Sequence, residues 1–107
     1  MNQKFSFHIP KVAYVNEEYI PIHYEKFEDS LGKKLKEIGI TAWYIISSSG
    51  FYQGRCYPQD IMVVYCDETK VVLVSEIYKK VCQDMAGVMK QEQFAYEFND
   101  ELMIFKI

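Results

Sequence analysis

Apolar and polar residues alternate at the start of the chain. Apolar side chains occupy every second position from Phe5 to Ile9, and polar side chains, among them His8, lie between them. A period of two predicts a strand with one buried face. Pro10 has no backbone N–H to donate, so the strand ends there or lies at a sheet edge. Residues 12–15 continue the strand after this interruption, and a turn follows.

Two later segments show the three- and four-residue spacing of amphipathic helices. The first covers residues 24–38, and Gly39 follows it as the residue type that commonly ends a helix. Gly32 lies in its middle, where glycine is unfavourable, and close packing on a sheet explains it. The second helix follows residues 67–69, which offer two capping side chains. It is expected to end near Gly87.

Four apolar runs outside these helices predict further strands. Residues 41–48 and 61–66 are rich in β-branched and aromatic side chains, which favour strands. Residues 94–98 alternate, and residues 102–107 form the last apolar run. The Asn-Asp pair between these last two runs predicts a tight hairpin turn.

The order of these elements indicates a fold class. It reads strand, helix, strand, strand, helix, strand, with one more strand at the C-terminus. Two helices on one face of an antiparallel sheet are typical of the ferredoxin-like plait. We therefore expect one α+β domain over residues 1–107: a ferredoxin-like plait (βαββαβ) with an extra C-terminal β-strand that forms a hairpin.

Charge and cysteine content narrow the classes of function. The formal net charge is −3, whereas nucleic-acid-binding domains usually carry a basic excess, so nucleic acid is an unlikely partner. The three cysteines lack metal-ligand or disulfide spacing, and no metal or other cofactor is expected. There is no apolar run of membrane-spanning length and no leader pattern, which favours a cytoplasmic protein without membrane contact.

One polar segment is the best candidate for binding. The expected hairpin over residues 47–57 combines hydroxyl groups, two glycines, three aromatic residues and the only arginine of the chain. Loops of such composition carry function more often than core segments do. We expect Ser49, Tyr52, Arg55 and Tyr57 to lie near a ligand or a partner. The alternative is a hairpin that only shields the sheet.

The aromatic content indicates association. Aromatic residues make up 16% of the chain. In a two-layer plait the helices cover one sheet face, and an uncovered face with many aromatic side chains forms an apolar patch that monomers rarely tolerate. A homodimer or another homo-oligomer is the ordinary solution. Another protein could also cover this face.

Part of the sequence resembles known small proteins. The run Leu-Lys-Glu-Ile-Gly-Ile-Thr at 35–41, a strand, and Ser-Gly-Phe at 49–51 resemble the PII-like signalling proteins and their cyclic-dinucleotide receptor relatives. This resemblance covers residues 24–82 and implies trimers that bind nucleotides at clefts between subunits. The chain also looks like small uncharacterised proteins encoded on conjugative elements of AT-rich Gram-positive bacteria.

Three hypotheses of function follow from these patterns. The first is a non-enzymatic interaction or accessory module that self-associates through an aromatic sheet face or an edge strand. The second is a PII-like nucleotide sensor that uses the hairpin of residues 47–57. The third is an enzyme with Cys56 as the nucleophile, activated by the neighbouring Arg55. Its base would have to be His8 or His23, and nothing in the spacing places either histidine beside the thiol.

Overall fold

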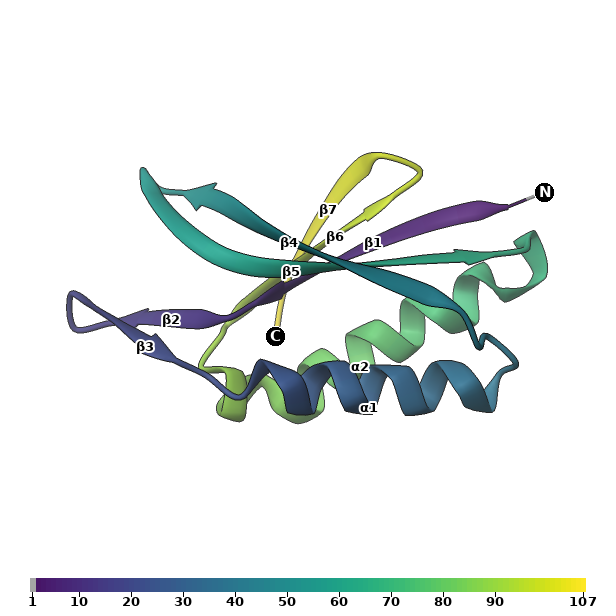
Figure 1. Cartoon of the computed structure of the whole chain (residues 1–107), viewed down its shortest axis with the longest axis horizontal. Coiled ribbons are helices and arrows are strands. Elements are labelled where there is room, and N and C mark those ends of the chain that lie inside the picture. The colour runs from purple at the N-terminus through teal and green to yellow at the C-terminus, as the bar shows by residue number, and fades with distance from the viewer. Residues whose placement is uncertain (1) are drawn as a thin grey trace.

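The computed structural model describes residues 2–107 as two layers, a sheet and a pair of helices (Figure 1). The strands are β1 (Gln3–Pro10), β2 (Val12–Val15), β3 (Glu18–Pro21), β4 (Trp43–Tyr52), β5 (Arg55–Cys66), β6 (Gln93–Phe98) and β7 (Glu101–Lys106). The helices are α1 (Tyr24–Glu37) and α2 (Val71–Met89), with a short 3-10 helix, η1 (Glu68–Lys70), before α2. Five strands form an antiparallel sheet in the order β4-β5-β1-β6-β7, and β2 and β3 form a separate hairpin.

The two helices pack on one face of the five-stranded sheet (Figure 1). In α1, the apolar stripe places Phe27, Leu31 and Leu35 in the core. A Cβ atom added to Gly32 would lie 2.9 Å from the ring of Trp43. The glycine thus lets the helix approach β4 closely, as its position in the sequence predicts.

Tyr78 of α2 is the centre of the core. Its side chain is fully buried and stacks on Phe7, with ring centroids 4.3 Å apart. The registered pairing of β1 with β6 ends at Phe7 and Tyr96. Just beyond that point, the Tyr78 hydroxyl lies 2.9 Å from both the His8 and the Ala95 carbonyl oxygens and donates to them. A side chain of the helical layer therefore joins two strands where the ladder stops.

The α+β class and the C-terminal hairpin are confirmed, but the expected strand count is wrong. Residues 2–107 contain seven strands, because β2 and β3 form a hairpin where the sequence predicts one continued strand and a turn. Its two-residue turn has Asn16 at φ 50° and Glu17 at φ 65°. Left-handed backbone of this kind usually carries glycine, so the turn signal is weak in the sequence.

The polar stretch of residues 47–60 is also more regular than expected. Strands β4 and β5 run through it and meet at a tight turn in which Gln53 (φ 50°) and Gly54 (φ 76°) are left-handed. The second helix, α2, passes Gly87 and ends at Met89, with Lys90 in the left-handed cap position. Glycine therefore does not end this helix.

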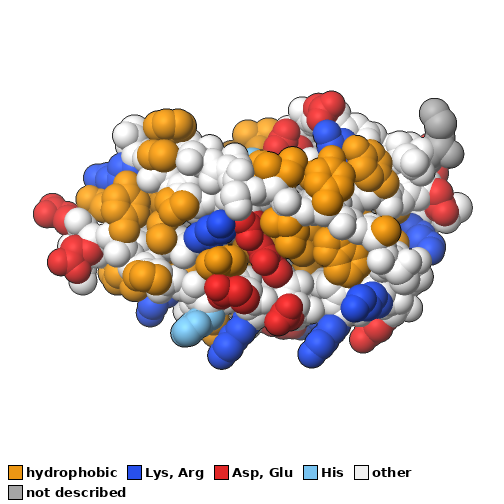
Figure 2. Space-filling view, in the orientation of Figure 1, with side chains coloured by type: hydrophobic (Ala, Val, Ile, Leu, Met, Phe, Trp, Pro, Cys, Tyr) orange, Lys and Arg blue, Asp and Glu red, His pale blue; other side chains and the backbone are white. Residues whose placement is uncertain are grey.

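The sheet face opposite the helices is largely apolar and accessible. Six of its side chains are large, hydrophobic and at least 45% exposed: Tyr44, Ile46, Tyr52, Tyr65, Leu102 and Ile104. Charged side chains lie along the outer edge of the helical layer, whereas hydrophobic side chains are prominent on the sheet side (Figure 2). No helix of residues 2–107 is long and apolar enough to span a membrane.

Candidate functional site

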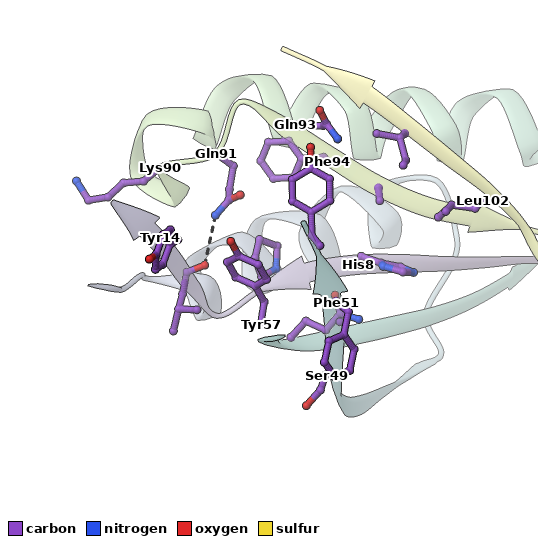
Figure 3. Close-up of a pocket in the computed structure, with 17 residues that line it drawn as sticks. His8, Tyr14, Ser49, Phe51, Tyr57, Lys90, Gln91, Gln93, Phe94 and Leu102 are labelled. Carbon is purple, nitrogen blue, oxygen red and sulfur yellow. Dashed lines mark hydrogen bonds between the residues drawn. The ribbon is translucent and has the colours of Figure 1, made fainter. Parts of the chain in front are cut away.

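A pocket of about 520 Å³ opens on the sheet face opposite the helices (Figure 3). The strand register shows on which face of the sheet the pocket lies. Most lining positions alternate along each strand with the buried positions that face the helices. The lining residues come from β1, β2, the β4–β5 hairpin, the end of α2, β6 and β7. The pocket is thus assembled from segments that are far apart in the sequence.

The walls of the pocket are aromatic and amide-rich. The aromatic lining residues are Tyr14, Phe51, Tyr52, Tyr57 and Phe94. Three glutamine side chains contribute amide groups, and the Gln91 amide donates to the Val12 carbonyl oxygen at 3.4 Å (Figure 3). Among the residues described, no aspartate or glutamate lines the pocket, and Lys90 is the one lysine that does.

A histidine–carboxylate pair lies at the pocket. His8 of β1 lines it, and its Nε2 atom is 2.7 Å from Oε2 of Glu97 on β6. Both side chains are partly buried. The carbonyl oxygen of His8 accepts a hydrogen bond from the buried Tyr78 hydroxyl of α2. This bond holds the backbone that carries the imidazole in place from the helix side of the sheet. A histidine held by a carboxylate in this way can accept and release a proton.

The structure brings the residues expected to bind a ligand to one end of this pocket. Ser49, Tyr52 and Tyr57 belong to its lining. The guanidinium carbon of Arg55 lies 4.3 Å above the ring centre of Tyr14, which also lines the pocket. The Ser49 side chain points away from the other labelled groups (Figure 3), so its hydroxyl is badly placed to face a ligand there.

Sequence reasoning missed the part of the site that lies outside the hairpin. It named His8 only as a possible base for Cys56, because a single histidine on the polar side of a strand carries no motif. Its partner, Glu97, is 89 positions away. The alternation of β1 did place His8 on the side opposite Phe7, and that was the available signal.

The cysteines do not form a catalytic arrangement. Cys56 is exposed on β5, and the hydrogen bond of His8 goes to Glu97. Cys66 and Cys82 are buried, and burial raises the pKa of both thiols. They are core residues, as their positions on apolar faces predict. No group of three or more metal-ligating side chains is found within residues 2–107.

A second polar cluster lies on the helix side of the same strands. Asp60 of β5 is buried, and Lys11 Nζ lies 2.8 Å from its Oδ1 atom. Burial, together with the nearby Asp60, raises the pKa of Glu28 on α1 to about 8. Burial opposes the charge of Asp60, yet hydrogen bonds with Glu28 and Lys11 hold its pKa below the usual value. The cluster ties α1 to the sheet through a shared proton and one ammonium group.

Comparisons with known proteins show a shared fold. No family model and no curated protein matches the chain. A solved phage SAM lyase in complex with S-methyl-5'-thioadenosine is similar over 99% of this chain and 88% of its own, with a TM-score of 0.61 and 12% identity. A solved phage SAM lyase in the apo state is similar over 99% of this chain and 86% of its own, with a TM-score of 0.56 and 12% identity. At this identity the likeness shows a shared fold.

These likenesses correct the expected class of function. The sequence led us to expect a non-enzymatic accessory module, with a PII-like nucleotide sensor as the alternative. That expectation is wrong, because the solved structures that share the fold are those of a lyase. The error has a physical reason: the search relied on short motifs, whereas the pocket joins side chains from distant strands and so leaves no local motif.

Proposed function

We propose that the protein is an enzyme that cleaves S-adenosylmethionine and releases S-methyl-5'-thioadenosine. The observation that carries the proposal is the aromatic pocket with a histidine–glutamate pair at its wall. The shared fold with a phage SAM lyase supports the choice of substrate.

The size and walls of the pocket suit this substrate. Small-molecule sites usually enclose about 300–1,000 Å³, and this pocket has about 520 Å³. Rings such as Tyr52 and Tyr57 offer faces on which an adenine can stack. The same faces attract a positive charge, here the sulfonium of the substrate. The pocket therefore recognises both features without a carboxylate in its lining.

The His8–Glu97 pair supplies the acid–base chemistry. Release of S-methyl-5'-thioadenosine breaks the bond between the sulfonium sulfur and the four-carbon amino-acid arm, and the electron pair of that bond passes to sulfur. In the proposed step, His8 takes a proton from the carbon next to the one that bears sulfur, and the arm leaves as an unsaturated amino acid. Glu97 stabilises the imidazolium that forms. Atoms and charges balance without a second reactant.

The test is incubation of the purified protein with S-adenosylmethionine and analysis of both products by mass spectrometry. We expect S-methyl-5'-thioadenosine, and a loss of about 10²–10⁴-fold in kcat/KM in His8→Gln. His23→Gln is the matched control, because His23 is exposed before α1 and lies outside the pocket lining.

Two outcomes would contradict parts of the proposal. Equal activity of His8→Gln and His23→Gln would remove His8 from the reaction. A cyclic ester as the second product would mean that the arm's own carboxylate attacks, so His8 would not be the base. In that case the lyase activity would stand and the role of the histidine would fall.

We further propose that the chain forms a homo-oligomer through the sheet face opposite the helices. The exposed apolar side chains of that face outside the pocket lining support this: Tyr44 is 48%, Ile46 47% and Tyr65 45% exposed. Light scattering at dilute concentration is the test. A mass of one chain would contradict the proposal, and a multiple that Ile46→Lys reduces to one chain would support it.

We also propose that the fold is a ferredoxin-like plait with two additions. The strand order β4-β5-β1-β6, with both helices on one face, supports this interpretation. The β2–β3 hairpin would then be an insertion after the first strand, and β7 an added edge strand.

A further inference from the structure

The only arginine of the chain stands beside the pocket. Arg55 pairs with Tyr52 across the β4–β5 turn, and Tyr57 is the next residue on the same side of β5. Both tyrosines line the pocket. The guanidinium of Arg55 lies over the ring of Tyr14, a third lining residue, with 4.3 Å between its central carbon and the ring centre. This stack holds a flexible side chain in one place at the rim.

A second cation lies at the pocket. Lys90, which follows α2, belongs to the same pocket lining as Tyr14. The ion pairs of residues 2–107 join other groups, and neither Arg55 nor Lys90 takes part in one. The carboxylate of Glu97 is engaged with His8. The pocket thus has one positive group in its lining, Lys90, and one stacked on a lining residue, Arg55, and neither is paired with an acidic side chain of residues 2–107.

We propose that Arg55 and Lys90 bind the carboxylate of the substrate's amino-acid arm. This inference rests on the proposed function and names the part of the substrate that these two cations recognise. A guanidinium matches a carboxylate with two parallel hydrogen bonds, and an ammonium adds a third donor group. With the carboxylate held there, the sulfonium and adenine lie against the aromatic walls. Arg55 then makes the pocket discriminate between substrates that carry a carboxylate and adenosyl compounds that lack one.

Three adenosyl ligands test the inference by calorimetry. S-adenosylmethionine carries the carboxylate, whereas its decarboxylated analogue and S-methyl-5'-thioadenosine lack it. Binding is measured in the His8→Gln background so that the substrate is not consumed. Arg55→Met should raise the Kd of S-adenosylmethionine by about 10-fold to 100-fold, the range for hydrogen bonds to a charged group. It should change the other two Kd values less than about twofold. Lys90→Gln should show the same selectivity with a smaller effect.

Matched variants separate recognition from general disturbance. Arg55→Lys keeps the charge but loses the fork, so its loss should be intermediate. Lys33→Met removes an exposed cation of α1 outside the pocket lining and should leave all three Kd values unchanged. The urea midpoint of Arg55→Met should equal that of the parent, because the side chain is exposed.

The outcomes distinguish this inference from the proposed function. If Arg55→Met raises the Kd of all three ligands equally, or changes none of them, the inference is overturned while the proposed function stands. A larger effect on adenosine monophosphate than on S-adenosylmethionine also overturns it, since the anion recognised would be a phosphate. Failure of all three adenosyl ligands to bind overturns the proposed function together with this inference.

Discussion

Replacing Tyr78 by phenylalanine tests how the core holds the site. The ring and its stack on Phe7 are kept, and the substitution removes one hydroxyl that is fully buried. Burial raises the pKa of Tyr78 well above its usual value, so the group stays protonated and acts as a donor. It lies 2.9 Å from the carbonyl oxygens of His8 and Ala95. Without it, both buried acceptors lose this donor, at a cost of about 1–3 kcal/mol.

Urea unfolding of Tyr78→Phe measures this cost. We expect a lower midpoint with an unchanged slope, because the surface exposed on unfolding is the same. In a thermal scan, each kcal/mol lost should lower Tm by roughly 4–8 °C for a chain of this size. Turnover should fall as well, because the carbonyl of His8, the proposed base, loses its hydrogen-bond donor.

Tyr19→Phe is the control for the loss of a hydroxyl. Tyr19 is 48% exposed, so its substitution should change the free energy of unfolding by less than about 0.5 kcal/mol. If Tyr78→Phe were as stable as Tyr19→Phe, the hydroxyl would not be the donor that joins β1 and β6, and the proposed support of His8 would be refuted.

Two further predictions concern the contact between α1 and the sheet. Glu28 has a pKa of about 8 in the folded state, against the ordinary 4.5. Between these two pH values the folded state holds one more proton than the unfolded state. The free energy of unfolding therefore falls as pH rises from about 5 to 8. Asp60, with its lowered pKa, is ionised in both states in this window and adds no slope. Glu28→Gln should flatten the fall in a series of urea midpoints, and an unchanged slope would contradict the shared proton. Gly32→Ala gains helix propensity of up to about 1 kcal/mol, but its Cβ would meet the Trp43 ring at 2.9 Å, and overpacking costs about 1–3 kcal/mol. We expect net destabilisation in thermal melts, and a stabilised variant would show that the ring moves aside freely.

The sequence reveals elements whose signal is local. The alternation of Phe5, Phe7 and Ile9 is enough to predict β1, and all three side chains are buried. The C-terminal hairpin is equally clear, because Asn99 and Asp100 tolerate the left-handed backbone that its turn requires. The β2–β3 hairpin escaped prediction because Glu17 is an unusual residue for such a turn.

The candidate site is only half readable from the sequence. Tyr52, Arg55 and Tyr57 were singled out because their hairpin concentrates unusual side chains in one short stretch. His8 and Glu97 become a pair only when β6 returns beside β1, which no local pattern encodes. Long-range strand pairing therefore decides the chemistry, and that is why the sequence alone favoured a non-enzymatic function.

The most direct measurement follows the bond that the proposed reaction breaks. S-adenosylmethionine labelled with carbon-13 in its methyl group is mixed with the protein and observed by NMR. We predict that the sulfonium methyl signal is replaced by a thioether methyl signal with the label retained on S-methyl-5'-thioadenosine, and that His8→Gln slows this change while His23→Gln does not. The account would be contradicted if the sulfonium signal persisted when folded protein is present at the same concentration as the substrate.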